Sequence, residues 1–177
     1  MTHIPSSGVV WFTGLSGSGK TALARWFADE WQRRGKPVEM LDGDAIRDVF
    51  PTGFSKAERD AHVKRVGYLA SRLEFHGVTV VASLVSPYRE PRDFVRGLCR
   101  NFIEIYVSTP LEECERRDTK GLYARARRGE IRNFTGIDDP YEPPEAPDLV
   151  IDTSRVSLEA AGQQVLDVVR ARLGDTR

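Results

Sequence analysis

A glycine-rich segment, residues 14–21, constrains the fold of this chain more than any other feature. It reads Gly-Leu-Ser-Gly-Ser-Gly-Lys-Thr and matches the phosphate-binding pattern G-x-x-x-x-G-K-S/T at every fixed position. An apolar run, 9–12, precedes it and a helical pattern follows it, which is the strand–loop–helix context that such a loop requires. The alternative is a Gly/Ser-rich turn that binds nothing.

The context favours a binding site for a nucleoside triphosphate and Mg²⁺. Backbone N–H groups of such a loop cradle phosphate oxygens, the lysine reaches the β- and γ-phosphates, and the final hydroxyl ligates the metal. The positive end of the dipole of the next helix adds to the site. Its predicted residues are Gly14, Leu15, Ser16, Gly17, Ser18, Gly19, Lys20 and Thr21, with Thr21 as a metal ligand.

Short apolar runs rich in β-branched residues recur along the chain, and the segments between them can be helical. The runs lie at 9–13, 38–41, 78–85, 102–107 and 149–151. Strands that are apolar along their whole length are typical of a parallel sheet buried on both faces. We therefore expect an α/β protein of the P-loop NTPase fold, with a doubly wound, mainly parallel five-stranded sheet and helices on both faces, as one domain over 1–177.

Basic and acidic side chains are equally frequent, 26 of each. Overall charge therefore favours neither nucleic acid nor an anionic membrane as a partner. The N-terminus has no signal-peptide pattern, and no apolar run reaches membrane-spanning length. Cys99 and Cys114 lack metal-ligand spacing and are expected to be buried thiols rather than a disulfide. These features predict a cytoplasmic protein with no nucleic-acid or membrane partner.

The stretch from about 118 to 147 interrupts the alternation of strands and helices. It holds Gly121, Gly129, Gly136 and four prolines, with at most a short helix near 122–128. Long loops within a compact domain are usually functional or disordered. Residues 116–132 carry seven basic side chains and two acidic ones. This pattern predicts a mobile basic lid that faces the phosphate loop; the alternative, for most individual arginines, is a solvated charged loop.

Two carboxylates, Asp42 and Asp44, follow the second predicted strand. The carboxyl ends of parallel strands form the ligand-binding edge of an open α/β sheet. A carboxylate at that edge can orient Mg²⁺ or accept a proton from an attacking hydroxyl, and Asp44 is the candidate for this role. The alternative is that Asp44 caps the helix that begins at Ala45.

A capping box at Ser55 and Glu58 begins a long helix that carries Arg59 on its apolar stripe. Arg59 should therefore overhang the sheet edge or reach into the crevice. We expect His62 to be a satisfied structural histidine or a neutral hydrogen-bonding contact rather than a titrating catalyst. Phe54, just before the cap, can act as a hydrophobic staple or stack on a base.

Polar residues also follow the third and fourth predicted strands. Ser86 can end its strand, cap the helix near Pro91, or carry a covalent phosphoryl group, although the last role needs an activating base that the sequence does not reveal. Thr109 and Glu112 are predicted to form the N-cap and capping box of the helix after the fourth strand.

Taken together, these segments resemble adenylylsulfate kinase, the family that phosphorylates adenosine 5′-phosphosulfate (APS). The resemblance runs from the first predicted strand to the last. The Lys-Gly-Leu-Tyr element at 120–123 and the Asn-Phe-Thr-Gly-Ile element at 133–137 are much more specific than the phosphate loop. The other matching segments are 14–21, 41–47, 53–55 with Arg59, 86–89, 117–119 and 138–142.

The resemblance implies transfer of the ATP γ-phosphoryl group to the 3′-hydroxyl of APS, giving 3′-phosphoadenosine 5′-phosphosulfate for sulfate assimilation. It implies ATP and Mg²⁺ as cofactors and suggests a homodimer, and it raises the question of association with a sulfate adenylyltransferase. Phe54 and Phe134 would sandwich the adenine of APS. Arg47, Arg59 and Lys120 would hold its phosphosulfate.

The family also implies a division of catalytic roles. Lys20 would neutralise charge on the transferred group, while Asp44 would prepare the 3′-hydroxyl and hold Mg²⁺ together with Thr21. Ser86 lies at the position to which a phosphoserine is commonly assigned, although direct transfer requires only positioning and charge neutralisation. The remaining implied contacts are Arg117 for ATP, and His62, Val85, Ser86, Leu122 and Gly136 for APS.

The chain departs from the family pattern at three places. Many members have Asn where this chain has His62, and imidazole can also donate a hydrogen bond but differs in charge and reach. The connection 48–52 is shorter than in many relatives, and Thr119 replaces a usual proline in the lid.

Two other functions remain open from the sequence. A kinase of the same architecture could act on another small hydroxyl compound, with His62 as the feature that allows it. A nucleotide-binding regulatory switch is the second, although the chain has no guanine-reading Asn-Lys-x-Asp element.

Overall fold

Five parallel strands form the centre of the protein in the computed structural model, which describes residues 7–174. Their order across the sheet is β2-β3-β1-β4-β5, and every neighbouring pair is parallel. The predicted five-stranded parallel sheet is thereby confirmed. The strands are β1 (Val9–Thr13), β2 (Val38–Asp42), β3 (Thr79–Ser83), β4 (Phe102–Val107) and β5 (Leu149–Ile151).

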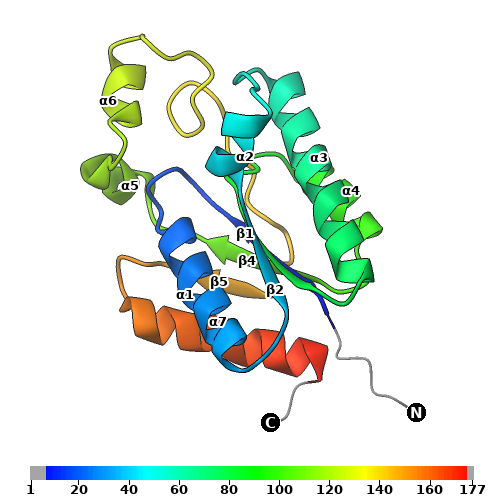
Figure 1. The fold of residues 1–177 in the computed structure, drawn as a ribbon. Coiled ribbons are helices and arrows are strands. Elements are labelled where there is room, and N and C mark those ends of the chain that lie inside the picture. The colour runs from blue at the N-terminus through cyan, green and yellow to red at the C-terminus, as the bar shows by residue number, and fades with distance from the viewer. Residues whose placement is uncertain (1–6, 175–177) are drawn as a thin grey trace.

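Helices cover both faces of the sheet, as expected for a doubly wound fold (Figure 1). One face carries α1 (Lys20–Arg33) and α7 (Leu158–Leu173), and the other carries α3 (Lys56–Phe75) and α4 (Arg89–Leu98). Three short helices lie beside the ligand-binding edge: α2 (Gly43–Val49) follows β2, α5 (Leu111–Arg117) follows β4, and α6 (Leu122–Arg127) follows α5.

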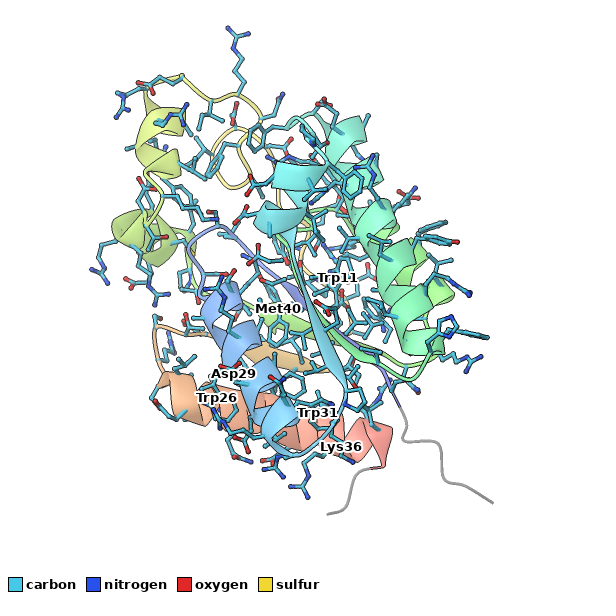
Figure 2. The ribbon with its side chains drawn as sticks, viewed as in Figure 1. Trp11, Trp26, Asp29, Trp31, Lys36 and Met40 are labelled. Atoms are coloured by element: carbon cyan, nitrogen blue, oxygen red, sulfur yellow. The ribbon has the colours of Figure 1, made fainter. Side chains whose placement is uncertain are left out.

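The two faces bury separate apolar clusters. On the α1 and α7 side, Phe27 and Trp31 stack with ring centroids 5.4 Å apart. Trp26 lies where α1 and α7 run together (Figure 2), against Gly162, whose lack of a side chain allows the close approach. On the side toward α3, Trp11 packs 5.9 Å from the ring of Phe102. The two clusters anchor the helices to the sheet, and the sheet in turn positions the phosphate loop and the residues at its carboxyl edge.

Of the helix caps predicted from the sequence, one is present and two are not. The capping box of Ser55 and Glu58 is present at the start of α3 and confirms the prediction. Thr109 was the wrong N-cap for α5: Pro110 occupies that position, and the Thr109 hydroxyl donates to the Ser18 carbonyl instead. Asp44 is not an N-cap either, because the Asp42 carboxylate caps α2.

Close packing of α3 on α4 depends on Gly67, and this contact leads to a stability prediction. A Cβ added there would lie 2.2 Å from Cγ2 of the fully buried Val95. We expect Gly67→Ala to destabilise the fold by about 1–3 kcal/mol, because overpacking outweighs the gain in helix propensity. Thermal unfolding should show a melting temperature lower by roughly 2–4 °C for each kcal/mol.

Gly97→Ala, on α4, is the matched control for this prediction. No atom lies within 4 Å of a Cβ added at Gly97. Only the helix-propensity gain of up to about 1 kcal/mol then acts, so the melting temperature should rise slightly. A Gly67→Ala protein as stable as the wild type would contradict the packing argument.

Among residues 7–174, no helix is both long enough and apolar enough to cross a lipid bilayer. Cys99 and Cys114 are free thiols, as predicted, the first half-buried and the second buried. The predicted extent of the domain, 1–177, includes chain ends that lie outside the described residues and stays a prediction.

Candidate active site

The phosphate loop joins β1 to α1 with a backbone that only glycine accommodates at its crowded points. Gly14 has φ +152°, and a Cβ there would lie 2.4 Å from the Val107 carbonyl oxygen. Gly19 has φ +94°, with Thr153 Oγ1 only 2.9 Å from an added Cβ. The loop is therefore pressed against β4 and the segment after β5, which holds its curvature in place.

Lys20 is a buried cation at the start of α1. Its Nζ donates to the Leu15 carbonyl at 2.6 Å and lies 3.4 Å from Ser18 Oγ. Burial lowers the pKa of Lys20 to about 8. The ammonium group thus folds back on its own loop, where oxygens of a bound phosphate could replace the backbone acceptor.

Residues distant in sequence, Thr109, Arg117 and Thr153, support the phosphate loop through hydrogen bonds. Thr153 Oγ1 donates to the Ser18 carbonyl at 2.7 Å, and the Thr109 hydroxyl lies 2.9 Å from Thr153 Oγ1. Arg117 Nη1 donates to Thr153 Oγ1 at 2.9 Å. The sequence had pointed to Arg117 but not to Thr153, which follows β5 without any recognisable motif.

A cavity of about 360 Å³ lies over the carboxyl edge of the sheet, and most of the predicted site residues line it together. Gly14, Leu15, Ser18 and Gly136 do not line it. The predicted residues that do are Ser16, Gly17, Gly19, Lys20, Thr21, Asp44, Arg47, Phe54, Arg59, His62, Val85, Ser86, Arg117, Lys120, Leu122 and Phe134. Sequence reasoning missed Ala22, Gly43, Val63, Ser83, Leu84, Pro87, Thr119 and Thr135.

Among the missed residues, Ser83 could have been found from its place at the end of a strand, next to a strand that ends in Asp42. It ends β3 beside Asp42 of β2, and its hydroxyl lies 3.4 Å from Thr21 Oγ1. Gly136 does not line the cavity, and a Cβ added there would meet the side chains of Leu111 and Leu15, so its predicted contact with substrate stays a prediction. Its φ of +95° serves the turn that brings Phe134 to the cavity.

Asp44 lies on the first turn of α2, and its side chain is two-thirds exposed. Lys120 reaches across from the segment before α6 and donates from Nζ to Asp44 Oδ2. Two predicted site residues from different segments of the cavity wall therefore form an ion pair. Asp44 must exchange this partner if it is to contact a metal or a substrate hydroxyl.

An arginine pair surrounds the ring of Phe54. The guanidinium carbons of Arg47 and Arg59 lie 5.0 and 5.4 Å from the ring centroid. Arg59 is buried, and it donates to the carbonyls of Phe54 at 2.9 Å and of Asn133 at 2.6 Å. The staple interpretation of Phe54 is wrong, because the residue at the fourth helical position is Arg59 rather than an apolar partner, and Phe54 stays 39% exposed.

His62 is 2% exposed, and neither of its ring nitrogens makes a hydrogen bond of regular geometry among the described residues, although the nearby Gly43 backbone acts to raise its pKa. It is therefore not the satisfied structural histidine that was one of the two expectations. Burial, followed by the positive charges of Arg47 and Arg65, lowers the pKa of His62 to about 4. A neutral imidazole with unused hydrogen-bonding capacity thus lines the cavity, which suits a contact to a ligand.

Ser86 is 3% exposed, and its hydroxyl is engaged inside the protein. Trp11 Nε1 donates to Ser86 Oγ at 3.1 Å, and Ser86 Oγ donates to Thr13 Oγ1 at 2.9 Å. The residue has φ +39°, a left-handed conformation. It lies beyond the end of β3 at Ser83 and does not cap α4, whose N-cap is Tyr88, so neither structural alternative holds.

The segment predicted as a basic lid contacts the phosphate loop, but most of its positive charge is neutralised locally. Tyr123 donates from its hydroxyl to the Ser16 carbonyl at 2.7 Å and packs edge-on against Phe134. Arg117 and Lys120 are the two predicted lid cations among the described residues that line the cavity. The pairs Arg116–Glu113, Arg125–Glu130, Arg127–Glu115 and Arg128–Glu130 form on the outside.

For those four arginines the solvated alternative was the better interpretation. Glu113 and Glu115 lie on α5, and both precede the basic stretch 116–132. Two cations, Arg117 and Lys120, therefore line the cavity in place of a basic surface, and each is itself paired with a carboxylate, Glu113 and Asp44 respectively.

The oxygen donors near the loop fit a metal that arrives with a nucleotide. Thr21, Ser83 and Asp44 supply two hydroxyls and one carboxylate to the same cavity. Within 7–174, no group of three or more His, Cys, Asp or Glu side chains could hold a metal by itself. Mg²⁺ in nucleotide sites commonly takes one or two protein ligands and completes its shell with phosphates and water. The donor set suits that arrangement.

Comparison with known proteins gives one family for this combination of fold and site. A family model described as adenylylsulphate kinase matches residues 6–152. An adenylyl-sulfate kinase of Synechococcus sp. strain JA-3-3Ab is 52% identical over 164 residues, covering 92% of this chain and 93% of the relative. An adenylyl-sulfate kinase of Chloroflexus aurantiacus is 51% identical over 163 residues, covering 89% and 88%.

Solved structures agree with the sequence relatives. The Mycobacterium tuberculosis APS kinase CysC in complex with AMPPNP and APS is 40% identical, with a TM-score of 0.89, covering 94% of this chain and 99% of that one. A shikimate kinase from Acinetobacter baumannii, 16% identical with a TM-score of 0.65, shares the fold alone.

Proposed function

The chain belongs to the adenylyl-sulfate kinase family, and we propose that its cavity holds ATP and APS together for direct phosphoryl transfer. It is an ATP-dependent phosphotransferase that phosphorylates APS. The observation that carries the proposal is that one cavity is lined by the phosphate loop on one side and by Phe54, Arg59 and Phe134 on the other. Donor and acceptor can therefore meet without a carrier.

On the donor side, the loop N–H groups and Lys20 hold the triphosphate of ATP. Lys20 leaves the Leu15 carbonyl and places its charge on the β- and γ-phosphates. Thr21 and Asp44 would hold Mg²⁺, which supplies neutralisation of phosphate charge when it is bound. Arg117, held by Thr153, lies at the edge of the loop and would contact the nucleotide.

On the acceptor side, Phe54 and Phe134 would contact the adenine of APS, while Arg47, Arg59 and Lys120 contact its phosphosulfate. Guanidinium groups suit this ligand because they match the geometry of planar and tetrahedral oxyanions. The neutral His62 would add a hydrogen bond to the bound substrate from a nitrogen that has no protein partner. Val85 and Leu122 complete the cavity wall.

Asp44 would accept the proton of the 3′-hydroxyl as that oxygen attacks the γ-phosphorus and the bond to the β-phosphate oxygen breaks. Binding of the phosphosulfate to Lys120 would draw this cation away from Asp44 and free the carboxylate. The lid, proposed at about 118–147, would then exclude water, which otherwise competes as the acceptor. Ser86 would contribute through its position, because its hydroxyl already contacts Trp11, Thr13 and the Leu84 carbonyl.

Purified protein with ATP and APS provides the direct test. ADP release that depends on APS, with 3′-phosphorylated product identified by mass spectrometry, is the expected result. Adenosine monophosphate and simple alcohols serve as control acceptors and should support far less release. Equal rates of ADP release with and without APS would refute the function. Faster ADP release with another alcohol would show that the acceptor belongs to a different class of compound.

The low pKa of Lys20 predicts a pH dependence for ATP. Lys20 loses its charge in the free enzyme above pH 8, since burial lowers its pKa to about 8. Because kcat/KM reports the ionisation of the free enzyme, kcat/KM for ATP should be maximal below about pH 8 and fall above it. Bound phosphates stabilise the ammonium form, so kcat at saturating ATP should fall only at higher pH. A value of kcat/KM that stays constant well above pH 8 would contradict this role.

We also propose a cytoplasmic homodimer, with association with a sulfate adenylyltransferase as a separate question. Free thiols at Cys99 and Cys114 suit a reducing compartment. The APS kinase from Thiobacillus denitrificans, 34% identical to this chain, is hexameric, so an assembly larger than a dimer is the alternative. Light scattering of the purified protein decides the oligomeric state, and co-purification tests the partner. The outer faces of α3 and α4 expose Tyr68, Leu69, Phe75, Phe94 and Leu98, which could be covered in a dimer.

A further inference from the structure

Arg92 on α4 is a buried arginine that the reaction described above does not use. It is 2% exposed and does not line the main cavity. Its Nε lies 3.2 Å from Glu104 Oε1 on β4, and the Glu104 side chain is 5% exposed. A buried cation is retained only when its charge and its donors are matched, so the destinations of its other N–H groups are informative.

The two terminal nitrogens of Arg92 hold two loops that meet at the cavity edge. Nη1 donates to the Ser86 carbonyl at 2.6 Å, and Nη2 donates to the Glu142 carbonyl at 2.6 Å. The Glu142 N–H in turn donates to the Pro87 carbonyl at 2.7 Å. Arg92 thereby ties the cavity-lining pair Ser86 and Pro87 to the distal end of the lid segment.

The same cluster reaches the root of the phosphate loop. Tyr141 lies next to Glu142, with its ring 5.7 Å from the Arg92 guanidinium and its hydroxyl 2.8 Å from Thr13 Oγ1. Thr13 is the last residue of β1, and its hydroxyl also accepts from Ser86 Oγ. Ser86 adopts its left-handed backbone in the middle of these contacts. A single guanidinium fork therefore braces a conformation that a serine adopts rarely.

We propose that Arg92 is a positioning residue for the acceptor side of the cavity, holding Ser86 and Pro87 against the Glu142 segment so that APS is aligned with the donor phosphate. This inference rests on the proposed function. ATP binding depends on Arg92 much less, because Thr109, Thr153 and Arg117 support the phosphate loop independently.

Arg96 offers a matched control one turn further along α4. Its Nη2 lies 2.6 Å from Glu104 Oε2, so it shares the carboxylate partner of Arg92. Its side chain is 40% exposed, however, and its guanidinium group bonds to Glu104 rather than to the Ser86 or Glu142 carbonyls. Lysine at either position keeps a positive charge near Glu104 but cannot reproduce the rigid fork that spans two acceptors.

The experiment compares wild type, Arg92→Lys and Arg96→Lys by steady-state kinetics with APS and ATP varied separately. Arg92→Lys should lower kcat/KM for APS by about tenfold or more, since small misplacements of a reactant are costly. Its KM for ATP should stay close to that of the wild type, and Arg96→Lys should behave as the wild type for both substrates. Hydrogen exchange without substrates should be faster in residues 84–88 of Arg92→Lys alone.

Wild-type kinetics for Arg92→Lys, or an equal loss toward ATP and APS, would overturn the inference. If this variant does not fold, Arg92→Gln combined with Glu104→Gln removes both buried charges and must show the same split between substrates. Failure of both variants to fold would mean that Arg92 is structural only, and would also overturn it. A wild type without APS-dependent ADP release would refute the proposed function, while the exchange data would still decide whether Arg92 holds the loop.

Discussion

Replacing Lys20 by Met should reduce turnover by about a thousandfold, which is the scale for removing one preorganised charge from the transferring group. The side chain is 7% exposed, and its Nζ is the cation of the phosphate loop itself. Methionine fills similar space without a charge to bury, so the fold should keep a melting temperature near that of the wild type. Single-turnover assays with ATP and APS measure the loss directly.

Lys64→Met is the control for this change. Lys64 also lies on a helix and is ion-paired, with Glu90, but it does not line the cavity. Its variant should retain wild-type turnover. Substantial transfer by Lys20→Met, with a normal melting temperature, would show that the loop N–H groups and the metal suffice without this cation.

Replacing Asp44 by Asn should lower kcat by roughly a hundredfold to ten-thousandfold, the range for losing a positioned general base. The amide keeps the size of the side chain but loses the negative charge that would hold Mg²⁺ and accept a proton. Asp44 is exposed and forms its ion pair with the exposed Lys120, so the fold should not depend on it. ATP binding, measured by calorimetry, should persist.

Asp48→Asn tests whether the effect belongs to the position. Asp48 lies one turn further along the same short helix, is exposed, and does not line the cavity. Its variant should be indistinguishable from the wild type. If Asp44→Asn instead raised KM for APS and left kcat intact, Asp44 would be a binding residue and another group would have to take the proton.

Local signals predicted structure well only where the interaction itself is local. The capping box of Ser55 and Glu58 formed as expected because both partners lie within one turn. Thr109 had an equally good N-cap pattern, but its hydroxyl found the Ser18 carbonyl, which is distant in sequence. A pattern cannot indicate that a tertiary acceptor competes with a helix end.

The charges of the lid illustrate the same limit. A count within 116–132 predicted a basic surface, yet Glu113 and Glu115 neutralise Arg116 and Arg127. Helix geometry decides the first pair, which lies within α5, and the turn between α5 and α6 decides the second. Composition within a window does not include partners that lie outside it.

The sequence by itself determined the sheet, the phosphate loop and most of the cavity lining, because apolar periodicity and the loop pattern are written in consecutive residues and because parallel strands end at one edge. Tertiary structure alone decided which polar groups pair across that edge. It left His62 buried without a partner, set Thr153 behind the loop, and placed Arg92 between the Ser86 and Glu142 carbonyls. Each of these depends on backbone groups brought together from distant segments, and a carbonyl carries no residue identity that a sequence could reveal.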